Sequence, residues 1–346
     1  MGSGVGARLA GGVTVPAHPL ALDSEGKPDL LAQRALTRYY AAAGADGLAI
    51  GVHTTQFDLH HDRDLLREIW ELGAATALES PRPPMLIAGV CGDVHAAVAE
   101  AEMAASTGYT VALLCSWGMA DTSEQAQIER AAAVGEILPT VAFYLQESVG
   151  GRRLSRAYWA RLFDLACVVA VKTAPFDRYR TNDVLQVLLE HDRWDEVAVL
   201  TGNDDTIVHD LVTPYRRQAE HNVREIRIRG GLLGQWAVGT RAAVALVAAA
   251  REAGQAGAVR DDLLATAPDL VEINAAILDV AHDFAGCVPG VNEVLRQQGL
   301  LGSARCLSSG ERLSPGQQAA ITAVRSRFPR LLDEEFVADN KHLWLQ

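Results

Sequence analysis

The chain has 346 residues, of which 49% are hydrophobic and 21% charged, a balance typical of a globular protein with a large core. Its net charge of -12 argues against a surface that follows the phosphates of a nucleic acid. No uncharged run reaches the roughly 18 residues that a membrane span needs, and residues 1–12 lack the apolar core of a signal peptide, so we expect no membrane binding.

Short runs with strand character alternate with helical patterns over 13–253. The expected strands are 13–16, 47–51, 85–90, 110–114, 140–144, 168–172, 197–201 and 225–229. The helices expected after them are 29–43, 63–78, 93–106, 123–137, 155–164, 181–189, a stretch after Asp205, and 234–253. Eight such units predict a parallel sheet closed into a (β/α)8 TIM barrel over 1–254. The alternative is an open doubly wound sheet, but no glycine-rich fingerprint follows the first strand.

The remaining residues, 255–346, are expected to form a C-terminal helical extension without chemistry of its own. Its expected helices are 269–284, 291–298, 315–328 and 333–340, separated by proline and glycine.

The cysteines suggest a reducing compartment. Their positions are Cys91, Cys115, Cys167, Cys287 and Cys306. None forms a CxxC pair and four lie in apolar segments, so we expect reduced, mostly buried thiols and a cytoplasmic location.

Lys172 is the most informative single residue. Only three of the 31 basic residues are lysines, and Lys172 is the one that ends an apolar run, 165–172. Arginine would supply positive charge equally well, but it cannot lose its proton or form an imine. A lysine at the C-terminal end of the sixth strand, where TIM barrels carry their active sites, therefore indicates amine chemistry. The alternative is a strand-end lysine whose head reaches water.

Tyr144 ends the neighbouring expected strand. A period of two would point Lys172 into the barrel together with Ala170 and Val168. Adjacent strands lie ~4.8 Å apart, so the amine and the phenol could approach each other. A tyrosine beside a desolvated lysine is a proton shuttle suited to imine formation. The alternative is an aromatic side chain at the barrel rim.

Histidines add two further interpretations. His53 follows the second strand and is either a general acid or base or a loop histidine bonded to backbone. The run His60, His61 and Asp62 indicates a solvated helix start rather than a zinc site, because adjacent residues point apart. We expect neither a metal nor a cofactor. Arg229, at the end of the expected eighth strand, either meets an acidic substrate or pairs with a carboxylate.

Several short motifs along the chain, in order, resemble the dihydrodipicolinate synthase / N-acetylneuraminate lyase family of Schiff-base aldolases. The Gly-Thr-Thr-Gly-Glu loop of that family is similar to 51–56, Gly-Val-His-Thr-Thr-Gln. Its strand-five tyrosine matches Tyr144, its imine lysine matches Lys172, and its Gly-Asp-Asp resembles the segment that begins at Gly202.

The resemblance implies the chemistry of the site. Lys172 would form an imine with a small 2-oxo acid such as pyruvate, and Tyr144 would move protons. Thr54 and Thr55 would hold the substrate carboxylate. Members of the family are commonly homotetramers, so a homo-oligomer, tetramer or dimer, is implied. His53, Gly202 and Arg152 complete the expected substrate-binding set.

Some positions differ from the family pattern. The stretch after strand four, 114–119, contains no second tyrosine, and Arg152 comes later after Tyr144 than the family arginine does. These departures favour another oxo-acid aldolase, hydratase or lyase over the lysine-biosynthesis reaction. The alternative is a catalytically degenerate barrel that binds a carboxylate metabolite as a sensor or scaffold.

Overall fold

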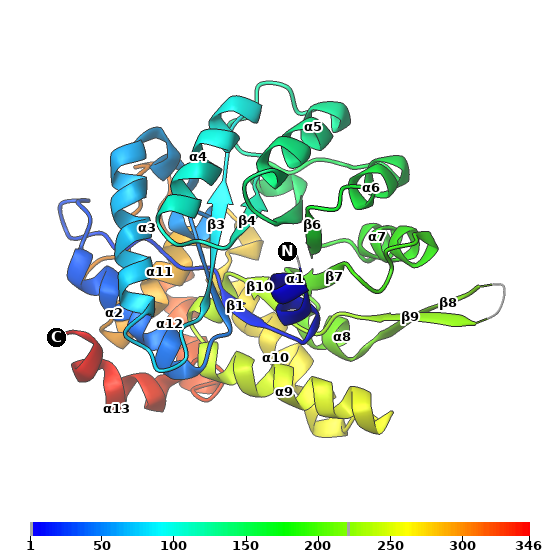
Figure 1. Cartoon of the computed structure of the whole chain (residues 1–346). Coiled ribbons are helices and arrows are strands. Elements are labelled where there is room, and N and C mark those ends of the chain that lie inside the picture. Colours follow the sequence, from blue (N-terminus) through cyan, green and yellow to red (C-terminus); the bar gives the residue numbers. More distant parts are fainter. Residues whose placement is uncertain (1–2, 220–221) are drawn as a thin grey trace.

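The computed structural model describes residues 3–219 and 222–346, and a ring of eight parallel strands lies at its centre (Figure 1). The strands are β1 (Thr14–Pro16), β2 (Gly47–Ile50), β3 (Met85–Val90), β4 (Val111–Leu114), β5 (Thr140–Leu145), β6 (Val168–Ala174), β7 (Ala198–Thr201) and β10 (Gly231–Leu233). Their order is β1-β10-β7-β6-β5-β4-β3-β2. A parallel bridge between Ala17 and Ala49 brings β1 to β2 and closes the ring. The predicted TIM barrel is confirmed.

Helices pack around the outside of the ring. They are α2 (Leu30–Ala43), α3 (Arg63–Ala77), α4 (Val94–Ser106), α5 (Glu124–Gly135), α6 (Arg156–Phe163), α7 (Arg178–Glu190), α8 (Ile207–Val212) and α9 (Thr240–Ala256). From α2 to α7, each begins at an aspartate or serine whose side chain accepts a backbone N–H of the first turn. These caps explain where the helices start. Within the described residues, we find no helix long and apolar enough to cross a lipid bilayer.

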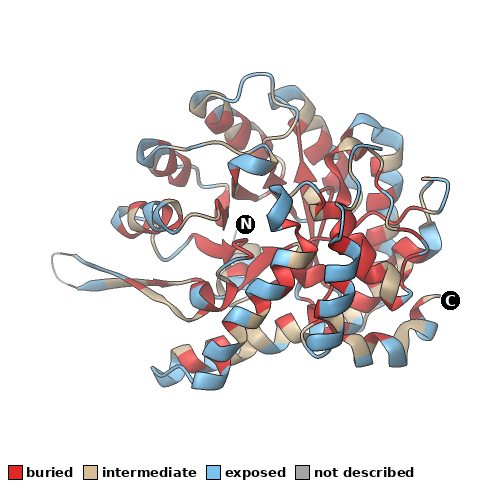
Figure 2. Ribbon diagram, turned by 180° about the vertical axis from the view of Figure 1, so that it is seen from behind, coloured by how far each residue is buried: buried red, intermediate tan, exposed pale blue. Residues whose placement is uncertain are grey.

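Buried residues form two layers of the core, and Figure 2 colours the central strands as buried. One fills the inside of the ring and includes Val15, Ile87, Val111, Val141 and Leu200. The other lies between the strands and the surrounding helices. The short helix α1 (Ser3–Ala10) contacts β6 and β7, and its Leu9 joins the inner layer (Figure 1). Because α1 packs beside Val169 at the start of β6, it covers the N-terminal end of the barrel and leaves the C-terminal end as the mouth.

The prediction of 225–229 as the eighth barrel strand is wrong. The segment β9 (Val223–Arg227) pairs antiparallel with β8 (Pro214–Gln218) in a separate two-stranded arm that projects from the body (Figure 1). The eighth barrel strand is β10, which pairs with β1 and β7. Arg229 precedes β10 and lies away from the mouth, where it lines a surface cavity together with Leu9 and Ala10 of α1. The mixture of charged and apolar residues in β9 suits a partly exposed arm, whereas the short, fully buried β10 carries no period.

The C-terminal region packs against the barrel through four helices. They are α10 (Asp261–Ile277), α11 (Cys287–Gln298), α12 (Gln317–Arg327) and α13 (Glu334–Trp344). Contacts join α10 to α8 and α9, and α13 to α2. The first expected helix, 269–284, is wrong at both ends, because α10 includes Pro268 and stops at Ile277. The expected boundary between 254 and 255 falls in the last turn of α9.

Asp333 ties this region to the barrel, and we predict that the Asp333→Ala variant loses stability. Its buried carboxylate accepts hydrogen bonds from Tyr39 Oη at 2.7 Å, Arg241 N at 2.7 Å and Ala242 N at 3.0 Å. Removing the carboxylate leaves these three donors without an acceptor and should lower the free energy of unfolding by about 3 kcal/mol. Urea denaturation measures the change, with Asp339→Ala on the exposed side of α13 as control. Equal midpoints for the two variants would contradict the prediction.

Candidate active site

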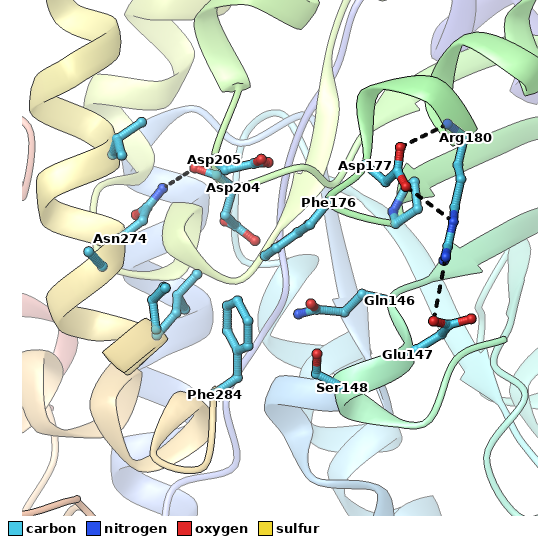
Figure 3. A pocket seen from close by; sticks show the side chains of 15 residues that line it. Gln146, Glu147, Ser148, Phe176, Asp177, Arg180, Asp204, Asp205, Asn274 and Phe284 are labelled. Atoms are coloured by element: carbon cyan, nitrogen blue, oxygen red, sulfur yellow. Dashed lines mark hydrogen bonds and ion pairs between the residues drawn. The ribbon is translucent and has the colours of Figure 1, made fainter. Parts of the chain in front are cut away.

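Two adjoining cavities open at the C-terminal ends of the strands. The inner cavity, of about 60 Å³, contains Lys172 and is otherwise walled mainly by apolar side chains. The outer cavity, of about 470 Å³, is formed by the loops after β5, β6 and β7 together with α10 and the 3₁₀ turn η5 (Val280–His282) (Figure 3). Residues shared by the two linings are Gln146, Phe176, Asp204, Leu278 and Phe284. The C-terminal region therefore helps to form the site, which the sequence did not predict.

Lys172 lies at the base of the inner cavity, on β6. Its residue is 8% exposed, and its Nζ lies 4.1 Å from the centre of the Phe143 ring. Burial lowers the pKa of Lys172 to about 8, and the negative charge of Asp204 opposes this shift. A sizeable fraction of neutral amine is therefore present near neutral pH, and this fraction rises as the pH rises through about 8.

Gly202, the first residue after β7, makes room for the lysine. A Cβ at this position would lie 2.5 Å from Lys172 Cε and 2.9 Å from Ala174 Cβ. The predicted substrate-binding glycine thus faces the inner cavity, where the absence of a side chain lets the lysine stem pass. Any larger residue would displace the amine.

The structure does not bring Tyr144 to Lys172. The pairing of β5 with β6 starts with Thr140 opposite Val168, then skips Val169, so that Phe143 lies opposite Lys172 and Tyr144 opposite Thr173. The extra residue lies on β6, so it turns Lys172 to the inner face, where Phe143 of β5 also points. Tyr144 shares the outer face of β5 with Ala142, and its ring lies 5.2 Å from that of Trp159.

Phe143 takes the place beside the amine that the phenol was expected to occupy. An uninterrupted register from the Thr140–Val168 pair would have put Tyr144 opposite Lys172, so the irregularity alone accounts for the difference. The same irregularity turns Val168 outward, although it was expected to share the inner face with Lys172. Phe143 carries no proton to transfer, so the Lys172–Tyr144 pair is not assembled here.

Of the three substrate-binding residues predicted in the loop after β2, two line the inner cavity and one does not. His53 and Thr54 line the inner cavity, and the Thr54 hydroxyl donates to Ala17 O at 2.8 Å. Thr55 lies outside it and is structural, because its hydroxyl donates to His18 O at 2.7 Å and accepts from Gly51 N at 3.0 Å. Burial lowers the pKa of His53 to about 4, and the Lys172 charge adds to the shift, so this imidazole is neutral at physiological pH.

Arg152 lies outside both cavities. Its guanidinium donates to the carbonyl and hydroxyl oxygens of Thr122, in the loop before α5. The arginine that does line the outer cavity is Arg180 of α7, which pairs with Glu147 at 3.4 Å and Asp177 at 3.3 Å (Figure 3). Its position in a helix carries no signal in the sequence, because the barrel rule points to the loops at strand ends.

Asp204 is the ionisable group that the predicted site set left out. It lines both cavities, and Asn274 of α10 donates to its main-chain oxygen at 2.6 Å (Figure 3). Burial raises the pKa of Asp204 to about 7, although the positive charge of Lys172 opposes the shift. Its Oδ1 has no hydrogen-bond partner among the described residues. The signal that could have found it was its place in the strand-seven loop.

A second buried polar cluster joins the loops after β2 and β3 to α4. His60, Cys91 and Glu100 have ligand atoms within 4.8 Å of one another, close enough to hold a metal ion. However, His60 bonds Glu100 and Gly51 O at 2.8 Å each, and Glu100 also accepts Cys91 N. These bonds already satisfy the imidazole and the carboxylate. Of the run expected at a solvated helix start, His61 and Asp62 are exposed, and Asp62 is the N-cap of α3, whereas His60 is buried.

Solved structures match this arrangement of strands, helices and mouth. Dihydrodipicolinate synthase from Oceanobacillus iheyensis aligns with a TM-score of 0.74 at 16% identity over 94% of this chain and 99% of that chain. The chain has the dihydrodipicolinate synthase fold.

Two further structures share this fold. YagE, a prophage protein of the dihydrodipicolinic acid synthase family from E. coli K12 in complex with pyruvate, aligns with a TM-score of 0.74 at 16% identity, covering 91% of this chain and 98% of that chain. N-acetylneuraminate lyase from Fusobacterium nucleatum aligns with a TM-score of 0.72 at 15% identity, covering 92% and 98%. No protein-family model and no curated protein matches the sequence.

The lysine pKa can be measured directly, because the chain has only three lysines. In protein labelled with ¹³C at the lysine ε-carbon, we expect one signal to titrate with a midpoint near pH 8 and to vanish in Lys172→Met. Desolvation favours the neutral amine and sets this direction. A Lys172 midpoint above 10 would show that the amine is solvated.

The close packing of Lys172 against Gly202 gives a second prediction. The Gly202→Ala variant should move or displace the Lys172 signal, because the new methyl group overlaps the lysine stem. Gly302→Ala is the matched control, since a Cβ there meets nothing within 4 Å. An unchanged lysine signal in both variants would contradict the packing argument.

Proposed function

We propose that the protein is a lyase of the aldolase type that forms a Schiff base between Lys172 and a small 2-oxo acid. The observation that carries the proposal is a buried lysine amine, with a pKa of about 8, at the base of a small cavity in the barrel mouth. A lysine is activated as a nucleophile when its surroundings disfavour the charged form. The glycine opposite its stem keeps this position free.

The chemistry begins with attack of neutral Nζ on the ketone carbon. Loss of water from the carbinolamine gives a protonated imine, which accepts electrons from an adjacent carbon. A carbon–carbon or carbon–oxygen bond next to the former carbonyl can then form or break. Thr54 and His53 line the cavity beside Lys172 and are the groups available to the substrate carboxylate.

The similar structures support a 2-oxo acid as substrate class. The YagE structure and a structure of the Fusobacterium nucleatum lyase contain pyruvate. The inner cavity, of about 60 Å³, has room for a molecule of that size and little more, because one water needs roughly 10–15 Å³ of such space. The larger outer cavity would take the second reactant or the rest of a longer substrate.

Phe143 favours a second candidate. With a phenyl ring where the phenol was expected, the barrel would retain the lysine without its proton carrier. A catalytically degenerate barrel that binds a carboxylate metabolite as a sensor or scaffold is therefore the competing function.

Borohydride trapping tests the first candidate. Wild-type protein incubated with pyruvate and sodium borohydride should gain the mass of one reduced pyruvate imine, located at Lys172 by peptide mapping. Lys172→Arg should gain none, because a guanidinium does not form the imine. Lys27→Arg, at an exposed lysine, should behave as wild type. No adduct across a panel of 2-oxo acids, or an adduct that persists in Lys172→Arg, would refute the proposal. Turnover of a trapped acid separates the enzyme from the sensor.

The assembly is part of the same proposal. We expect a homo-oligomer, tetramer or dimer, which light scattering after size-exclusion chromatography measures.

A further inference from the structure

Imine chemistry on Lys172 needs a group that carries protons, and the inner cavity has few of them. A proton must reach the departing hydroxyl of the carbinolamine, and another must leave the reacting carbon or oxygen. Phe143 cannot do either. This inference rests on the proposed function and asks which side chain performs these transfers.

The ionisable groups around the amine come from four elements. They are His53 after β2, Cys115 after β4, Asp204 and Asp205 after β7, and Cys287 of α11. His53 has a pKa near 4 and holds no proton to give at neutral pH. Burial raises the pKa of Cys287 far above neutrality, so its thiol is a poor base. Cys115 lies within the inner core, outside the cavity lining, and Asp205 lines only the outer cavity.

Asp204 differs from these groups in its geometry. It follows Gly202, the residue whose missing side chain lets Lys172 pass, so the loop that makes room for the amine also carries the carboxyl. Its side chain points into the space bordered by Gln146, Phe176 and Phe284, where the two cavities meet (Figure 3). Its Oδ1 is buried and unpartnered in the described part of the chain, although buried carboxylate oxygens are normally paired.

The neighbours of Asp204 fix its backbone but leave Oδ1 of its carboxyl group without a hydrogen bond in the described residues. Asn274 fixes its main-chain oxygen, and Asn203 anchors the same loop by donating to Asp210 at 3.0 Å. Neither contact uses the free oxygen. We propose that Asp204 is the general acid and base of the reaction, acting in place of a phenol at the β5 position.

Each transfer balances with this one carboxyl. As an acid, Asp204 gives its proton to the carbinolamine hydroxyl, the C–O bond breaks, water leaves, and the nitrogen lone pair forms the imine. As a base in carbon–carbon cleavage, the carboxylate takes the proton of the substrate hydroxyl. The O–H electrons then form the carbonyl, the C–C bond breaks, and its electron pair forms the enamine double bond while the C=N electrons return to nitrogen. Asp204 gives the proton it has gained to the enamine carbon, which restores a protonated imine. Water then attacks this imine and gives a proton to the Asp204 carboxylate, and loss of the 2-oxo acid from the carbinolamine frees the Lys172 amine and returns the first state.

The raised pKa of Asp204, about 7, supports this cycle. A carboxyl that titrates near the working pH is present in both forms and can serve as acid and as base. The carboxylate fraction rises with pH through about 7, so a step that needs the base should accelerate over that range. Lys172, with its pKa near 8, limits the same pH profile, because imine formation needs the neutral amine and its fraction falls as the pH falls below about 8.

Exchange of the pyruvate methyl protons with deuterated solvent tests the proposal without knowledge of the second reactant. This exchange, followed by NMR, requires the imine to lose and regain a carbon-bound proton. Asp204→Asn should give the borohydride adduct at Lys172 more slowly but to the wild-type level, and its exchange rate should fall by roughly 100-fold or more. The inflection near pH 7 should vanish from the remaining rate. Asp192→Asn, at an exposed loop position, should exchange as wild type.

A cavity variant separates a proton carrier from a structural residue. In Asp204→Ala, added formate should restore part of the exchange, which no structural role would produce. Wild-type exchange in Asp204→Asn would overturn the assignment. So would an adduct that stays below the wild-type level after long incubation with saturating pyruvate in a folded Asp204→Asn protein, since that assigns Asp204 to binding. Absence of any adduct on the wild-type protein would instead refute the proposed function itself.

Discussion

The one-residue slip between β5 and β6 decides which side chains meet the amine of Lys172. Skipping Val169 turns Lys172 to the face of Phe143, whereas Tyr144 stays on the other face of β5, beside Trp159 in the outer layer. Because side chains alternate along a strand, no small adjustment of rotamers could reverse that exchange. The apolar wall that results desolvates the amine and removes a hydroxyl from its side. The rest of the site has to be understood from this arrangement.

Burial shifts the pKa values of the two ionisable groups of the cavity in opposite directions, because it lowers that of Lys172 and raises that of Asp204. It disfavours charge on both Lys172 and Asp204, and their mutual attraction only partly restores it. The outcome is two groups that titrate within about one unit of each other, near neutral pH. A site built for tight ion pairing would fix both protons. With pKa values of about 8 and about 7, both groups can change protonation near neutral pH, which the proposed roles of nucleophile and acid–base partner would require.

The C-terminal region completes the mouth of the barrel. Leu278 and Phe284 wall the cavities, Asn274 holds the strand-seven loop, and Asp333 anchors the last helix to α9. Phe176 and Phe284 both have positive φ, of 49° and 67°, and the centres of their rings lie 5.5 Å apart. Such backbone is costly for a bulky residue and persists only when its surroundings fix it. Here the two phenylalanines border the passage between the cavities.

The sequence by itself determined the alternation of strands and helices, the barrel, and the position of Lys172 at its mouth, since these follow from local period and from strand ends. It also selected the loops that carry His53, Gly202 and Asp204. Tertiary structure decided the rest. Phe143 rather than Tyr144 lies opposite Lys172, and Arg152 lies outside the site. The eighth barrel strand is β10, and α10 lines the outer cavity. The physical reason is that periodicity reports which face of its own strand a residue occupies, whereas register depends on a partner strand that the local pattern does not describe.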